Sequence, residues 1–141
     1  MIHTAEIVRA ATIENLPVLH DFVEQACLQA GVSGEVAHDI RLALEEIWVN
    51  VATHGYAGRE PGPVRVVVQT GEGSMTVSVT DWGKQFDPTQ APEPHLNSHW
   101  TEWPAGGLGV HIVRRLVDDL RYYREPGGGN RLVLVKRLPE A

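Results

Sequence analysis

The sequence has 141 residues, of which 43% are hydrophobic and 21% charged, and its formal net charge is −6 with histidine neutral. This balance is typical of one globular domain with a hydrophobic core, and it argues against disorder and against a general attraction to nucleic acid or anionic membranes. We expect a single cytoplasmic domain over residues 1–141, because no apolar run is long enough to cross a bilayer, the start lacks a signal-peptide pattern, and the lone Cys27 excludes an internal disulfide.

Two helices are predicted in the first 55 residues, after a strand candidate at residues 3–10. The first helix spans residues 12–31 and has Thr12 as its expected N-cap. The second spans residues 33–55 and has Ser33 in the same position. Both carry apolar side chains at spacings of three and four residues, so each is expected to bury one face.

The second half of the chain combines strands with one more helix. Two alternating runs, residues 64–70 and 75–81, are separated by a glycine-containing turn and predict an antiparallel hairpin. A helix follows around residues 110–117. The end of the chain predicts a second hairpin, with its turn at residues 126–129 and its last strand at residues 132–138. Because helices and strands come in blocks, they favour an α+β layer architecture over a doubly wound parallel sheet.

Residues 84–106 follow neither period, and their four prolines and scattered aromatic residues predict a functional loop, such as a lid. Trp100 and Trp103 would either pack in this lid or contact another protein. His95 and His99 have a spacing that suits a metal on a helix, but no acidic or cysteine ligand stands nearby, and a solvated loop is the simpler interpretation.

Glu46 and Asn50 place a carboxylate and an amide one turn apart on the second helix. The simple alternative is a solvated polar face, but the neighbouring residues are largely apolar, so we expect the pair to be half-buried and functional. We expect the opposite side of the helix to carry Leu44, Ile47 and Val51 and to pack on a sheet.

Two further features carry chemistry. Asp81 ends a strand and is followed by Gly83, so its carboxylate is placed to accept a hydrogen bond from an exocyclic amine while the glycine lets a flat ring approach; the alternative is an ordinary turn. Gly106, Gly107 and Gly109 lead into the third helix, whose free N–H groups favour a phosphate; the alternative is a hinge. The sequence has neither a Rossmann fingerprint nor a P-loop.

In this order, the three features resemble the GHKL ATPase superfamily, whose members bind ATP on a two-layer α/β sandwich. The sequence is most similar to the bacterial anti-sigma-factor serine/threonine kinases of partner-switching systems. It shares with them the E-x-x-x-N-x-x-x-H-G-Y pattern at residues 46–56, F-D-P at residues 86–88 and G-G-L-G at residues 106–109. The resemblance implies the histidine-kinase-like ATPase fold, with a mixed, mostly antiparallel sheet and helices on one face.

The resemblance also implies ATP and Mg²⁺ as cofactors and a role for each matching residue. Asn50 would ligate Mg²⁺, and Glu46 would act as general base on the attacking hydroxyl. Asp81 would bind the adenine amine, and Phe86 would pack on the ring. The other positions expected at the nucleotide are His54, Gly83, Gly106, Gly107, Leu108, Gly109 and Asn130.

As function, the resemblance implies a protein serine/threonine kinase that phosphorylates a STAS-type anti-sigma-factor antagonist and also binds a sigma factor. Its relatives suggest a homodimer, and no direct contact with nucleic acid or membrane is expected. Related kinases often carry an arginine where this chain has Ala105, so Lys84 would have to replace it, and Asn130 replaces a threonine. Two alternatives are a non-catalytic, ATP-gated binding module and the detached ATPase half of a sensor histidine kinase.

Overall fold

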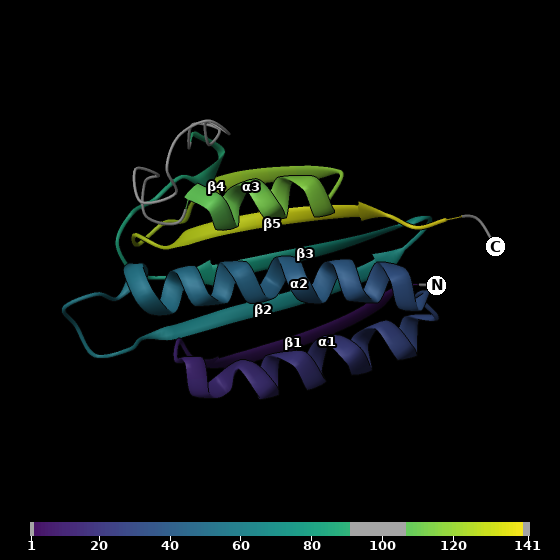
Figure 1. The fold of residues 1–141 in the computed structure, drawn as a ribbon, viewed down its shortest axis with the longest axis horizontal. Helices are drawn as coiled ribbons and strands as arrows, with labels where there is room; N and C mark the ends of the chain where they lie inside the picture. Colours follow the sequence, from purple (N-terminus) through teal and green to yellow (C-terminus); the bar gives the residue numbers. More distant parts are fainter. Residues whose placement is uncertain (1, 91–106, 140–141) are drawn as a thin grey trace.

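The computed structural model describes residues 2–90 and 107–139 (Figure 1). Its longer elements follow the predicted order closely. They are β1 (His3–Ala10), α1 (Leu16–Ala30), α2 (Gly34–Asn50), β2 (Pro63–Gly71), β3 (Ser74–Asp81), α3 (Gly107–Leu116), β4 (Asp119–Arg124) and β5 (Asn130–Arg137). Short 3-10 turns at Ile13–Asn15 and Pro88–Gln90 and a π-helical turn at Val51–Gly55 complete the described chain.

The five strands form one sheet in the order β1-β2-β3-β5-β4. Each of its four pairings is antiparallel, so in the described residues the sheet is antiparallel throughout rather than mixed. The three helices lie side by side over one face of this sheet (Figure 1). The result is the expected two-layer α+β architecture.

The core lies between the two layers and follows the alternation of the central strands. The side chains of β2 and β3 that face the helices are almost fully buried; they are Val64, Val66, Val68, Met75, Val77 and Val79. From the helical layer, Trp48 is 2% exposed, and its indole N–H donates to the backbone oxygen of Thr12 over 2.8 Å. Cys27 is buried among these residues, and burial raises the pKa of its thiol, so it behaves as the small core residue that its helical pattern predicts.

The helix ends match the sequence signals in part. Ser33 caps α2, since its Oγ accepts from the Val36 N–H over 3.4 Å, and Gly31 ends α1 with a left-handed φ of 70°. Thr12 is not the predicted side-chain cap, because it precedes a 3-10 turn and makes no capping hydrogen bond through its side chain. The predicted long helix at residues 33–55 is divided, with α2 ending at Asn50 and a π-helical turn continuing from it.

The register of the sheet brings two distant polar residues together at one end. Asp81, the last residue of β3, pairs with Asn130, the first residue of β5. Both side chains point to the helical layer and are buried there.

None of the helices in residues 2–90 and 107–139 is long and apolar enough to cross a membrane.

Candidate functional site

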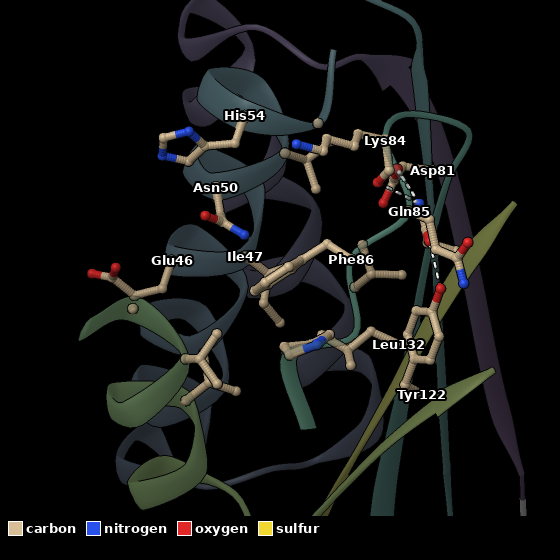
Figure 2. Close-up of a pocket in the computed structure, with 18 of the residues that line it drawn as sticks. Glu46, Ile47, Asn50, His54, Asp81, Lys84, Gln85, Phe86, Tyr122 and Leu132 are labelled. Atoms are coloured by element: carbon tan, nitrogen blue, oxygen red, sulfur yellow. Dashed lines mark hydrogen bonds between the residues drawn. The ribbon is translucent and has the colours of Figure 1, made fainter. Parts of the chain in front are cut away.

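A cavity of about 440 Å³ opens between the two layers beside Asp81 (Figure 2). Its walls come from the C-terminal half of α2 and the turn that follows, from the end of β3, from β4 and β5, from the loop after β3 and from the first turn of α3. Most of the residues predicted to act together therefore meet around one space, although they lie far apart along the sequence.

Successive turns of α2 each bring a polar side chain to this cavity. Glu46, Asn50 and His54 lie one above another along the helix and its π-helical extension (Figure 2). Ile47 and Val51 line the same cavity, so the expectation that they lie on the opposite side of the helix is wrong. The reason is that residues i and i+1 are only about 100° apart around a helix, so both can border one broad opening. The expected packing is confirmed, because Leu44 and Val51 belong to the core and Ile47 packs against it.

Glu46 also touches the start of α3. A Cβ atom on Gly109 would lie 3.1 Å from the Glu46 Oε2 atom, so glycine lets the first turn of α3 come close to this carboxylate. Burial raises the pKa of Glu46, and the charge of the adjacent Glu45 raises it further. Gly107 and Leu108 belong to the same first turn of α3, and the N–H groups at the start of a helix favour anions.

Asp81 marks the other end of the cavity. Its side chain is 8% exposed, and its Oδ1 accepts hydrogen bonds from the Gly83 N–H over 2.9 Å and from Asn130 Nδ2 over 3.1 Å. Burial raises the pKa of Asp81, while these two hydrogen bonds and the charge of Arg124 act in the opposite direction. The cavity thus offers a partly desolvated carboxylate to a ligand that carries a hydrogen-bond donor.

Gly83 has a packing task that the sequence did not predict. A Cβ atom there would lie 2.3 Å from the backbone oxygen of Gly55, and this same oxygen accepts a 2.6 Å hydrogen bond from the Lys84 N–H. The glycine therefore allows two backbones to pack together, and the approach of a flat ring beside it stays a prediction. This contact ties the loop after β3 to the end of the π-helical turn.

The loop after β3 closes the cavity with Phe86 and Pro88. Phe86 is 40% exposed, and its ring lies across the cavity beside Ile47 (Figure 2). An aromatic face in this position can pack on a flat ligand. The buried Pro88 begins a 3-10 turn that Asp87 caps, since its Oδ1 accepts from the Thr89 N–H over 2.9 Å.

The arrangement suits a nucleoside phosphate, with an acceptor and an aromatic ring at one end and an anion-binding helix start at the other. A family model described as "Histidine kinase-like ATPase domain" matches residues 9–136. The chain belongs to this family.

Named relatives fall within the same group. A protein named anti-sigma F factor from Clostridium beijerinckii is 31% identical over 102 residues, which cover 72% of this chain and 71% of that protein. A serine-protein kinase RsbW from Listeria innocua is 32% identical over 103 residues, covering 70% of this chain and 66% of the relative. The chain therefore spans about two thirds of the length of these relatives, slightly less for the Listeria protein.

A solved structure confirms the histidine kinase-like fold. The crystal structure of the RsbU and RsbW domains of a Mycobacterium tuberculosis protein superposes with a TM-score of 0.70 and covers 99% of this chain, but only 33% of that chain. Its sequence identity is 22%, so this likeness concerns the fold alone.

The sequence did not predict several of the residues that line or support this cavity. The cavity is also lined by Arg59, Leu120 and Tyr122. Behind the lining residues, Tyr56 accepts a hydrogen bond from the Trp82 N–H and Arg124 donates one to Asn130. Tyr56 could have been predicted, because it ends the E-x-x-x-N-x-x-x-H-G-Y pattern. Tyr122 and Arg124 lie in a strand whose alternating sequence does not indicate a function. Only the register of β4 against β5 places them beside Asn130.

Arg114 is a further difference from expectation. From the sequence alone, Arg114 and Arg115 with the aspartates that follow them predict a solvated helix face. Instead the Arg114 guanidinium donates to the backbone oxygens of Pro88 and Thr89, over 3.1 and 2.5 Å, and it thereby joins α3 to the loop after β3. Arg115 is exposed, as expected.

Part of the predicted site lies outside the described residues. This applies to Gly106 and to most of the predicted lid at residues 84–106, including His95, His99, Trp100, Trp103 and Ala105. Within residues 2–90 and 107–139, no group of three or more histidine, cysteine, aspartate or glutamate side chains is placed to hold a metal ion.

Proposed function

We propose that this domain binds ATP in the cavity, with adenine at Asp81 and the phosphates between Asn50 and the first turn of α3. The observation that carries this proposal is that one cavity joins a buried carboxylate at one end to the Glu46–Asn50 pair and a helix N-terminus at the other. Phe86 would pack on the adenine ring, and His54 would stand at the mouth of the cavity.

Mg²⁺ is the metal that we propose beside Asn50. The residues fit this ion, because Mg²⁺ prefers oxygen ligands and is usually held by one or two protein oxygens together with substrate phosphates and water. The Asn50 amide supplies such an oxygen on the cavity wall, with the Glu46 carboxylate one turn away. When bound, the ion would neutralise part of the phosphate charge.

The reaction that we propose is phosphoryl transfer to a serine or threonine of a STAS-type anti-sigma-factor antagonist. The names of the relatives, anti-sigma F factor and serine-protein kinase, support this assignment. The hydroxyl oxygen of the substrate would form a bond to the terminal phosphorus while the bond to the bridging oxygen of ADP breaks. Glu46 would accept the hydroxyl proton, and its raised pKa suits a base that must be deprotonated and yet hold a proton.

A second candidate is a non-catalytic module that changes partners with its nucleotide state. The observation that favours it is Ala105, which stands where related kinases often carry an arginine that touches the terminal phosphate. Among the described residues that line the cavity, Arg59 and Lys84 are the lysine and arginine side chains that would have to supply this charge. In either case a sigma factor is a proposed partner, and a homodimer is the proposed assembly.

Calorimetry with ATP and ADP, each with Mg²⁺, tests the binding site. Asp81→Asn should weaken both nucleotides, because it turns half of the acceptor carboxylate into a donor, while Asn50→Ala should weaken Mg-ATP. Asp21→Asn, on the exposed face of α1, is the matched control and should change neither. A wild-type protein that binds neither nucleotide at millimolar concentration would exclude the proposal.

Phosphate transfer needs a separate, paired measurement. Glu46→Gln should keep ATP affinity within a few-fold and lose about 10²–10⁴-fold in transfer to a STAS protein, measured by mass spectrometry. Glu24→Gln removes an exposed carboxylate of α1 that neither lines the cavity nor shifts the pKa of Glu46, and it should leave transfer intact. ATP-dependent binding of the STAS protein without any transfer by the wild type would favour the second candidate.

A further inference from the structure

Asn130 lies between two sets of hydrogen-bonding groups of opposite kind. Its Oδ1 faces two donors, the Tyr122 hydroxyl at 2.6 Å and Arg124 Nη1 at 3.1 Å. Its Nδ2 faces acceptors, namely Asp81 Oδ1 at 3.1 Å and the backbone oxygen of Lys84 at 3.1 Å. Asn130 and Asp81 are buried where β3 and β5 meet the cavity, Tyr122 is half-buried on the cavity wall, and Arg124 is exposed.

This arrangement allows only one orientation of the amide. An arginine guanidinium has donors and no acceptor, so the amide atom beside Arg124 must be the oxygen. A flipped amide would set its N–H groups against Arg124 and its oxygen against the carboxylate of Asp81 and the carbonyl of Lys84. Tyr122 and Arg124 therefore decide that Asn130 presents a donor to Asp81.

The orientation of the Asn130 amide determines the hydrogen bonds of Asp81. Asp81 Oδ1 accepts hydrogen bonds from both Asn130 Nδ2 and the Gly83 N–H. Within residues 2–90 and 107–139, the hydrogen bonds of the Asp81 side chain all go to this oxygen. Its Oδ2 is left to accept a bond from a ligand in the cavity. Burial raises the pKa of Asp81, and the two donors on Oδ1 oppose this effect by favouring the ionised form, which accepts hydrogen bonds but does not donate them.

We propose that Tyr122 and Asn130 are positioning residues that hold Asp81 as a pure hydrogen-bond acceptor and thereby make the cavity select a 6-aminopurine over a 6-oxopurine. The amino group of adenine donates to such a carboxylate, whereas the 6-oxo group of hypoxanthine or guanine presents a second acceptor to it. This inference rests on the proposed nucleotide site. It adds the residues that orient Asp81 and the choice of purine that follows from this orientation. Tyr122 lies on the cavity wall next to the network (Figure 2).

The test compares ATP with ITP, whose base differs from adenine at the 6-position and in the proton at N1. Dissociation constants are measured by calorimetry at constant Mg²⁺ for the wild type, Tyr122→Phe, Asn130→Asp and Tyr123→Phe. The wild type should prefer ATP by about 10-fold or more, because hydrogen bonds to charged groups discriminate at that level. Tyr123→Phe is the matched control, since Tyr123 is 41% exposed and adjacent in β4.

Both network variants should reduce the ratio of the two dissociation constants. Tyr122→Phe leaves Arg124 as the single donor to Asn130 and should lower the ratio several-fold. Asn130→Asp places a carboxylate against Asp81, so the pair will share a proton and donate to a 6-oxo group, and the ratio should approach one. Tyr123→Phe should keep the wild-type ratio.

The ratio separates positioning from mere structural support, because a loosened cavity weakens both nucleotides alike. An unchanged ratio in Tyr122→Phe and in Asn130→Asp overturns the inference, whatever happens to absolute affinity. If Asn130→Asp does not fold, Tyr122→Phe alone decides. Equal binding of ATP and ITP by the wild type overturns the selectivity while leaving the nucleotide site in place, whereas binding of neither overturns the proposed function as well.

Discussion

A Cβ atom on Gly83 would lie 2.3 Å from the backbone oxygen of Gly55, the last residue of the π-helical turn after α2. The Lys84 N–H donates to this same oxygen over 2.6 Å. The hydrogen bond from Lys84 to Gly55, together with the close approach that Gly83 permits, thus joins the helix that carries Asn50 to the loop that follows Asp81. The distance between the two ends of the cavity depends on this contact.

Gly83→Ala should therefore disturb both the fold and the site. Its methyl group meets backbone rather than a flexible side chain, so the loop must shift, and overpacking of this kind costs about 1–3 kcal/mol in the free energy of unfolding. Urea unfolding and ATP calorimetry would measure the two effects. Gly34→Ala is the control, because a Cβ atom in this first position of α2 meets nothing within 4 Å. Equal stability of the two variants would contradict the packing argument.

This contact shows where sequence reasoning reaches its limit. The helices, the hairpins and the polar residues Glu46, Asn50 and Asp81 could be predicted, because periodicity, caps and motif spacing are local signals. The role of Gly83 and the network from Tyr122 to Asn130 depend on which strands pair and in what register, and no local pattern encodes that. Matching the family motifs named Asn130 as a site residue, but its place behind Asp81 came only from the structure.

Tyr56 joins three segments through one hydroxyl group. It donates to the Pro63 backbone oxygen over 2.8 Å, at the start of β2, and accepts from the Trp82 N–H over 2.8 Å, directly after Asp81. Tyr56→Phe leaves both backbone groups without this partner, and we expect a loss of about 1–3 kcal/mol in the free energy of unfolding. Thermal unfolding of Tyr56→Phe beside Tyr123→Phe would check this, because the hydroxyl of Tyr123 lies on an exposed side chain. A loss in Tyr123→Phe as large as that in Tyr56→Phe would refute it.

Arg114 offers a prediction about local order. Its guanidinium holds the backbone oxygens of Pro88 and Thr89, so Arg114→Ala should release the 3-10 turn at Pro88–Gln90 from α3. Hydrogen exchange of the Thr89 amide should become faster, while the central strands β2 and β3 keep their protection. Arg115→Ala removes a neighbouring exposed arginine and should change neither. Faster exchange in both variants would point to general loosening of α3.

The last prediction concerns the charge of Glu46 and the pH dependence of stability. Burial, with a contribution from Glu45, raises the pKa of Glu46 in the folded protein, so the folded state holds this proton more tightly than the unfolded chain does. The contribution of this bound proton to the free energy of unfolding is therefore fully present below the pKa that Glu46 has in the unfolded chain. It is lost as pH rises through the higher pKa that Glu46 has in the folded protein. Glu46→Gln is neutral at every pH and avoids this loss.

We thus expect Glu46→Gln to melt at a higher temperature than the wild type at about pH 7.5, and the difference to shrink as pH falls to about 4, where Glu46 is protonated as well. Calorimetric melting of both proteins across this range is the measurement. A variant that is less stable than the wild type at neutral pH would mean that the carboxylate makes a favourable contact that the cavity geometry does not reveal. A stability gain combined with lost phosphate transfer would instead identify Glu46 as a group kept at a cost in stability, as expected of a general base in a partly desolvated site.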